Sequence, residues 1–168
     1  TSMDADHLDI YGTSEAIEAS FVEFADKITD KTKLFITKEL PIEGVTCSVN
    51  EDAVFKAFNV RIDNASYVFD VQTPTEILKD LRFGLPGRHN LMNALMAIAM
   101  ANLFGTPTEA IAKALASFKG IKRRFSYQIK TESKVYIDDY AHHPTEINAV
   151  NQAVRELYPG QKVLAIFQ

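Results

Sequence analysis

Four stretches of the chain carry apolar residues at helical spacing. They run from about Thr13 to Ile28, from Asn90 to Phe104, from Thr108 to Phe118 and from Pro144 to Leu157. In each stretch the apolar positions recur three or four residues apart and so share one face of a helix. The pattern predicts four amphipathic helices, the last opened by a proline, a residue favoured in the first turn.

Shorter stretches carry the pattern of strands. The candidates are 34–36, 58–62, 67–71, 125–129, 135–137 and a last strand that starts at Val163. The second and third alternate apolar residues around the polar turn 63–66, which predicts a β-hairpin. The strand at 135–137, the helix that opens at Pro144 and the strand from Val163 predict a βαβ crossover and hence a parallel sheet.

These elements together predict an α/β fold in two parts. The pair of helices ends near Ile121, where a new run of strands begins. We therefore expect one domain over residues 1–121 and the start of another over 122–168. The chain opens on Thr-Ser and closes on an apolar strand pattern, so we expect a segment excised from a longer protein.

Composition narrows the classes of function. The 168 residues hold 18 Lys and Arg against 22 Asp and Glu, a net charge of −4, which argues against nucleic acid or an anionic membrane as partner. The longest apolar run, Ala94–Ala101, is far shorter than the roughly 20 residues of a membrane span. The opening residues lack the features of a secretory signal, so we expect the cytoplasm. The single cysteine, Cys47, is expected to fill a buried strand position.

The segment Asp138–Pro144 is the strongest candidate for chemistry. It lies between the carboxyl end of a predicted strand and the start of a helix, where open α/β sheets bind ligands. The N–H groups of the helix start favour a phosphate, and an aspartate such as Asp139 can accept hydrogen bonds from a ribose. Alternatively, Asp139 or His143 only caps the helix and Tyr140 packs in the core.

A second candidate segment, Gly87–Asn93, also precedes a helix. Asn90 and Asn93 are three residues apart, so both amides lie on one side of the first turn and could bind a nucleotide. Asn93 stands in an apolar run, where a buried amide needs a partner. The alternative is that Asn90 is the N-cap and Asn93 is solvated.

Two charged segments remain ambiguous from the residues alone. Arg123 and Arg124 lie at the predicted domain joint, where a guanidinium could bind a phosphoryl group, although a lone basic pair is usually a solvated surface. The acidic stretch Asp4–Asp9, which includes His7, could hold a metal or could cap the first helix.

Taken in order, four segments resemble motifs of the Mur ligase family. They are Asp4–Asp9, Leu85–Asn93, Lys122–Phe125 and, most specifically, the sequence Asp-Asp-Tyr-Ala-His-His-Pro-Thr-Glu-Ile at 138–147. The resemblance implies three domains: one for a UDP-sugar, a central ATPase domain and a C-terminal Rossmann-like domain. This chain would then hold the second part of the central domain, with helices and a mixed sheet including a hairpin, and the opening βαβ of the third.

The resemblance also implies roles for individual residues. His7 would help to hold Mg²⁺, and His89, Asn90 and Asn93 would contact ATP. Asp139 would hold the ribose and Tyr140 would lie near the nucleotide. Arg124 would approach the phosphates, and His142 would lie near the reacting phosphoryl and acyl groups. The last motif implies UDP-N-acetylmuramate and L-alanine as substrates, joined through an acyl phosphate in peptidoglycan precursor synthesis.

The sequence departs from the family pattern at three points. It contains no Gly-x-x-x-x-Gly-Lys-Ser/Thr phosphate loop. It has no lysine between His7 and Asp26, where several relatives carry a carbamylated lysine, and it stops at Gln168, before most of the third domain. We therefore expect the UDP-binding and phosphate-loop segments to belong to the same longer chain and the isolated segment to be inactive.

Three other functions remain open from the sequence. One is a recycling ligase that joins a preformed tripeptide to the same sugar nucleotide. Another is a metal-dependent phosphoesterase that uses Asp4, Asp6, His7, Asp138, Asp139, His142 and His143. The third is a nucleotide-binding module that catalyses no reaction.

Overall fold

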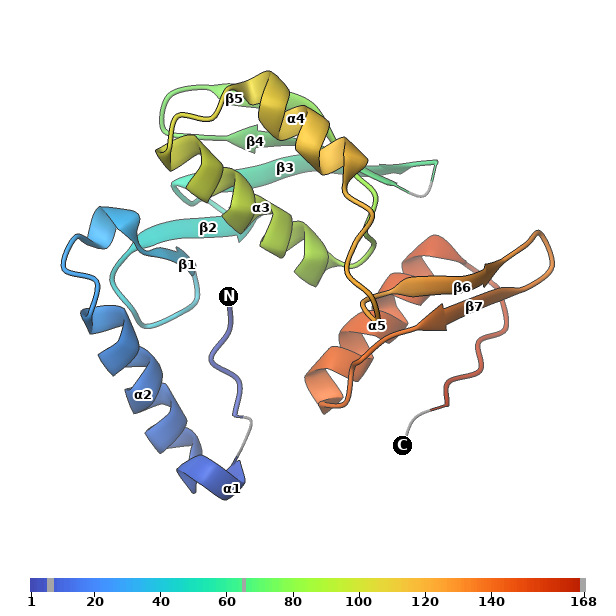
Figure 1. Ribbon diagram of the computed structural model, residues 1–168, viewed down its shortest axis with the longest axis horizontal. Coiled ribbons are helices and arrows are strands. Elements are labelled where there is room, and N and C mark those ends of the chain that lie inside the picture. Colours follow the sequence, from blue (N-terminus) through green and yellow to red (C-terminus); the bar gives the residue numbers. More distant parts are fainter. Residues whose placement is uncertain (6–7, 65, 167–168) are drawn as a thin grey trace.

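The computed structural model describes residues 1–5, 8–64 and 66–166 and shows a mixed α/β architecture (Figure 1). A five-stranded sheet has the order β1-β2-β3-β4-β5, and a separate two-stranded sheet pairs β6 with β7. The strands of the larger sheet are β1 (Phe35–Thr37), β2 (Val45–Val49), β3 (Phe55–Asp63), β4 (Ser66–Gln72) and β5 (Ile77–Phe83). The predicted fold class is therefore confirmed.

The larger sheet changes from parallel to antiparallel at β3. Strand β1 pairs parallel with β2 and β2 parallel with β3, whereas β3, β4 and β5 pair antiparallel. The predicted hairpin is the β3–β4 pair, whose turn includes Asn64 at φ 50. Strand β5, absent from our prediction, extends the hairpin to a three-stranded meander.

Two β-bulges in this meander share one aspartate. Asn59 on β3 and Asp80 on β5 both have left-handed backbones, with φ of 52 and 53, where the strand registers shift. Asp70 on β4 lies between them: its Oδ2 accepts from Asn59 Nδ2 at 2.8 Å and its Oδ1 from the Asp80 N–H at 2.9 Å. A bulge bends and twists the strand that carries it. Beyond the bulge in β3, Ile62 is 42% exposed.

Helix α3 (Arg88–Leu103) covers one face of the sheet, and α4 (Thr108–Ser117) lies against β5 (Figure 1). The helix buries Leu91, Ala94, Leu95, Ile98 and Ala99 against the strands. Cys47 lies fully buried in this core on β2, as predicted, and burial raises the pKa of its thiol to about 12.

The first part of the chain forms α1 (Leu8–Tyr11), α2 (Ser14–Asp26) and the short 3-10 helix η1 (Lys31–Lys33). Thr13 caps α2 by accepting a hydrogen bond from the Ala16 N–H. Of the apolar residues on α2, only Ile17 and Ala25 are buried, and Phe24 stays 67% exposed. The predicted amphipathic helix is confirmed, while most of its apolar face lies uncovered in the described residues.

The second part of the chain contains β6 (Ser126–Lys130), β7 (Val135–Asp138) and α5 (Pro144–Leu157). The parallel βαβ crossover that we predicted for this part does not form in the described residues. Strands β6 and β7 pair antiparallel, and residues 163–166 form no strand. Leu164 and Ile166 are 83% and 89% exposed. An apolar alternation becomes a strand only where another strand accepts its backbone hydrogen bonds, and none does so within the described residues.

The two parts meet where α5 packs beside the start of α3 (Figure 1). Tyr67 on β4 is 3% exposed and bridges them: its hydroxyl donates to Glu156 Oε2 on α5 at 2.7 Å and accepts from the Gly87 N–H at 3.1 Å. No helix in the part of the chain that the structure describes is long and apolar enough to cross a membrane.

Candidate functional site

The loop between β7 and α5 is ordered around Asp139. Its Oδ2 accepts from the Phe125 N–H at 2.7 Å and its Oδ1 from the Ala141 N–H at 2.8 Å. The Tyr140 N–H donates to the Arg123 carbonyl at 2.8 Å. Arg123 and Phe125 both have left-handed backbones, with φ of 61 and 48. The loop therefore holds the joint before β6 in a conformation that non-glycine residues rarely adopt.

The start of α5 is a capping box. The His143 side chain accepts from the Thr145 N–H, and Glu146 Oε2 accepts from the N–H groups of His142 and His143 at 3.2 and 3.5 Å. Desolvation alone would raise the pKa of Glu146, but these two N–H donors and the charges of Arg124 and His142 outweigh it and lower the pKa. The carboxylate is therefore ionised at neutral pH.

Tyr140 is the centre of an exposed cluster of rings and cations. Its side chain is 51% exposed, and the guanidinium carbons of Arg123 and Arg124 lie 4.9 and 6.0 Å from its ring centroid. The His142 ring meets it edge-on, with centroids 5.2 Å apart. His142 Nδ1 also lies 3.0 Å from the Tyr140 carbonyl. An open aromatic face beside two guanidiniums suits a planar anionic ligand.

Helix α3 begins at Gly87, whose φ of +96 turns the chain so that the His89 ring folds back over it. A Cβ at Gly87 would lie 2.6 Å from His89 Cε1. Asn90 donates through Nδ2 to the Pro86 carbonyl at 2.6 Å, which orients its amide. Gly87, not Asn90, is the N-cap, and Asn93 is exposed, so our argument that Asn93 is a buried amide is wrong.

Charged residues from two segments distant in sequence influence the pKa of His89. Partial enclosure lowers the pKa of its imidazole, Asp139 and Glu146 oppose that effect, and Arg124 adds to it. The start of α3, the joint and the loop before α5 therefore share one electrostatic environment. At neutral pH the His89 ring is neutral and presents one donor and one acceptor.

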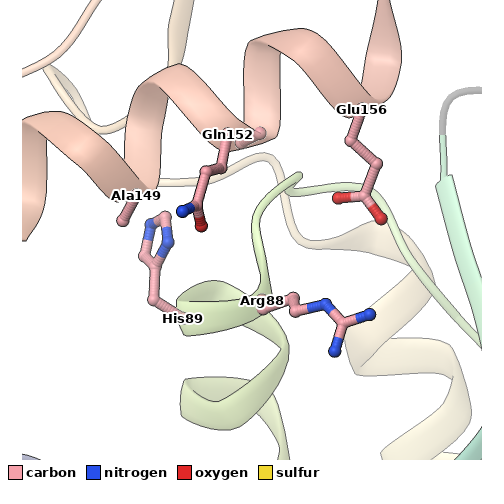
Figure 2. A pocket seen from close by; sticks show the side chains of 6 residues that line it. Arg88, His89, Ala149, Gln152 and Glu156 are labelled. Atoms are coloured by element: carbon pink, nitrogen blue, oxygen red, sulfur yellow. The ribbon is translucent and has the colours of Figure 1, made fainter.

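A pocket of about 260 Å³ lies beside this point, between α3 and α5. Figure 2 shows His89, from the start of α3, pointing toward α5 beside Ala149, while Arg88 extends sideways below Glu156; α5 also contributes Gln152. Its lining combines small apolar side chains with an imidazole, a guanidinium, an amide and a carboxylate.

The structure brings together most of the residues singled out from the sequence. Those near one another are His89, Arg124, Asp139, Tyr140 and His142, with Asn90 and Asn93 on the first turns of α3. His7, expected to bind metal, lies outside the described residues, as does Asp6. Within residues 1–5, 8–64 and 66–166, no three His, Cys, Asp or Glu side chains form a group that could hold a metal.

Sequence reasoning missed three residues at this place: Glu146, Arg88 and Glu156. The spacing of His143 and Glu146 carried a usable signal, because a residue at the N-cap and a glutamate three positions later form a capping box. The pairing of Glu156 with Tyr67 joins positions 89 residues apart and left no local signal.

Two family models match the chain. The model described as Mur ligase middle domain matches residues 1–101, and the one described as Mur ligase, glutamate ligase domain matches residues 123–168. The first alone covers more than half of the 168 residues.

Curated relatives match over the whole chain. A UDP-N-acetylmuramate–L-alanine ligase of Flavobacterium johnsoniae is 79% identical over 168 residues, all of this chain and 37% of the relative. The protein of the same name from Flavobacterium psychrophilum is 70% identical, and the match covers 38% of it. This chain thus spans little more than a third of the length of these relatives.

Solved structures share the fold. The UDP-N-acetylmuramate-alanine ligase of Thermotoga maritima superimposes with a TM-score of 0.74 at 29% identity, covering 94% of this chain and 37% of that one. MurF of Acinetobacter baumannii gives a TM-score of 0.77 at 23% identity, covering 91% and 36%. At the lower identity the likeness concerns the fold alone.

Proposed function

Because this chain belongs to the Mur ligase family, we propose that the longer protein containing it uses ATP to join L-alanine to UDP-N-acetylmuramate in peptidoglycan precursor synthesis. The observation that carries the proposal is the cluster of Arg124, Tyr140, His142 and Glu146 before and at the start of α5, together with His89, which lines the pocket between α3 and α5. The choice of L-alanine rests on the names of the relatives.

The residues around α3 fit the nucleoside of ATP. Asn93 and His89 are exposed, and the aromatic ring of Tyr140 is half-exposed. We assign His89, Asn90 and Asn93 to the base and Tyr140 to a stacking contact. Asp139 is assigned to the ribose: each carboxylate oxygen already accepts one backbone N–H and keeps a second lone pair for a hydroxyl.

Arg124 and His142 are assigned to the reacting groups. A carboxylate is a poor acyl donor, so the sugar's carboxylate first takes up the γ-phosphoryl group and ADP leaves. The amine of L-alanine then attacks the acyl carbon, inorganic phosphate leaves, and the amine loses a proton. Arg124 stabilises charge on the phosphoryl oxygens, and His142 lies beside the acyl phosphate as a hydrogen-bond donor.

We propose Mg²⁺ as the second cofactor, with His7 as one contact. The described residues supply no group of ligands for it.

The remaining assignments concern the whole protein. We propose that residues 1–121 belong to the central ATP-binding domain and that 122–168 begin the C-terminal domain. The UDP-sugar domain and the phosphate loop would lie in the rest of the longer chain, consistent with the 37% coverage of the relatives. Because the proposed reaction uses ATP and an amino acid, we propose that the longer protein acts in the cytoplasm. We propose neither a nucleic acid nor a membrane as its partner.

Phosphate release by the full-length protein tests this proposal. The assay supplies ATP, Mg²⁺ and UDP-N-acetylmuramate, with either L-alanine or a tripeptide as acceptor. We expect release that depends on L-alanine. Release only with tripeptide would assign the recycling ligase instead, release from a simple phosphoester without ATP would assign a phosphoesterase, and ATP binding without turnover would assign a binding module.

A further inference from the structure

Glu146 contacts both residues that we assign to the reacting groups. Its Oε1 lies 3.5 Å from Arg124 Nη1, and its Oε2 lies 3.6 Å from His142 Nδ1 and accepts from the His142 N–H at 3.2 Å. Arg124 and His142, which lie 22 and 4 residues before Glu146, are thus both contacted by one side chain.

Helix capping uses only one of the two carboxylate oxygens of Glu146. A capping box needs one glutamate oxygen on the N-cap N–H, and Oε2 satisfies it. The other oxygen, Oε1, faces Arg124 instead. Both partners are partly exposed, with side chains 35% and 49% accessible, and such ion pairs add little to stability. The contact therefore does more to orient the guanidinium than to hold the fold.

The neighbouring Arg123 and Arg124 differ in the groups that their guanidiniums contact. Arg123 lies over the Tyr140 ring at 4.9 Å, whereas Arg124 is 6.0 Å from it and reaches Glu146. Two adjacent guanidiniums near one ring thus have different partners. Arg124 contacts the same carboxylate that accepts from the His142 N–H.

We propose that Glu146 is a positioning residue for the ligase reaction, which fixes Arg124 and the His142 loop relative to each other through the two oxygens of one carboxylate. The proposal deepens the proposed function and rests on it. Glu146 touches no reacting atom; it acts through Arg124 and His142.

Glu146→Gln in the full-length protein separates capping from positioning. The carboxamide oxygen can still accept from the N–H groups of His142 and His143, so the thermal unfolding midpoint should stay close to that of the wild type. The amide has no charge to hold Arg124. We expect kcat to fall about tenfold or more, because small displacements of a catalytic group are costly, while KM for ATP changes less than about threefold. Glu132→Gln, in the exposed β6–β7 turn, is the matched control and should keep both constants.

A double-mutant cycle with Arg124→Ala shows whether Glu146 acts through Arg124. If it does, Glu146→Gln lowers kcat much less in the Arg124→Ala background than in the wild type. Equal losses in both backgrounds, an unchanged kcat in the single variant, or a loss explained by a lowered unfolding midpoint would each overturn the proposal.

A second readout needs no ligase activity. In the full-length protein with ¹⁵N-labelled arginine, the Arg124 Nε–H resonance, identified by its absence in Arg124→Lys, should shift in Glu146→Gln and stay in place in Glu132→Gln. If the wild type forms no product with L-alanine, the proposed function fails, and this shift alone decides whether Glu146 holds Arg124. An unmoved resonance would overturn the positioning role.

Discussion

At the scale of the residue, Tyr67 shows how one buried hydroxyl couples distant segments. It stands on β4, yet its oxygen joins the N–H of Gly87 before α3 to the carboxylate of Glu156 on α5. Burial and then the hydrogen bond to Glu156 raise the pKa of the phenol, which stays protonated and able to donate. The hydroxyl acts as donor and acceptor at once.

Tyr67→Phe should lower the free energy of unfolding by about 1–3 kcal/mol, because it leaves the Gly87 N–H buried without an acceptor. Urea denaturation measures the loss. Tyr136→Phe is the control, since that side chain is 58% exposed on β7 and its hydroxyl can form hydrogen bonds with water. Equal unfolding free energies for wild type and Tyr67→Phe would show that water replaces the hydroxyl.

At the scale of the element, the start of α3 depends on the left-handed backbone of Gly87. Its positive φ precedes the first turn of the helix, and the absence of a Cβ leaves room for the His89 ring, whose Cε1 would lie 2.6 Å from an added Cβ. Gly105, after the end of the same helix, has a φ of +70 and no atom within 4 Å of an added Cβ. Both glycines therefore have a positive φ that would strain any other residue, and they differ in what a side chain would displace.

We expect Gly105→Ala to cost about 1–2 kcal/mol of stability from the left-handed backbone alone. Gly87→Ala should cost more, and by moving the His89 ring it should weaken ATP binding by about tenfold, or about 1.4 kcal/mol. Urea denaturation and calorimetric titration of the full-length protein with ATP measure the two effects. If both variants bind ATP as the wild type does, His89 is not at the nucleoside.

We expect the stability of the meander to depend on pH through Asp70, which accepts hydrogen bonds from both β-bulges. The N–H of Asp80 and then the amide of Asn59 hold the pKa of Asp70 below its ordinary value. A lowered folded-state pKa means stability that is complete above the unfolded-state pKa of about 3.9 and is lost as the pH falls through the folded-state pKa.

Unfolding free energies between about pH 5 and pH 2 should therefore fall more steeply in the wild type than in Asp70→Asn. The difference should stay within about 1 kcal/mol, because this carboxylate is open to solvent. Glu132→Gln, an exposed carboxylate in the β6–β7 turn, is expected to keep the slope of the wild type. Parallel curves for all three proteins would mean that Asp70 does not hold the bulges.

At the scale of the whole molecule, the site forms only where the two parts of the chain meet. His89 and Asn90 come from α3, Arg124 from the joint, and Asp139 and His142 from the loop before α5. The hydrogen bond of Tyr67 to Glu156 holds α5 beside α3 at the same junction. A shift of one part against the other would separate the residues that we assign to the nucleoside from Arg124.

We expect the 168-residue chain by itself to release no phosphate from ATP above background, because its sequence contains no phosphate loop. The full-length protein should do so under the same conditions with UDP-N-acetylmuramate and L-alanine. A coupled phosphate assay on both proteins compares them. Turnover by the isolated chain would place the whole reaction within these residues.

The sequence by itself determined the elements with local signals. Helical spacing located α2, α3, α4 and α5, and alternation located the β3–β4 hairpin. The periods of a helix and of a strand are only a few residues long, so a short stretch of sequence shows them. It also located the loop at 138–144, since polar groups between a strand and a helix form a local pattern. Residue roles within that loop stay predictions.

Only the tertiary structure decided which residues meet. Whether 163–166 pair as a strand depends on a neighbour supplied from elsewhere, so their apolar pattern was insufficient. Asn93 is exposed because the sheet covers the opposite side of α3, which its own run of residues does not reveal. The contacts of Tyr67 with Glu156 and of Glu146 with Arg124 join residues 89 and 22 positions apart. The strength of a hydrogen bond or of a charge interaction depends on how far apart the two groups lie in space. Only the folded structure sets that distance.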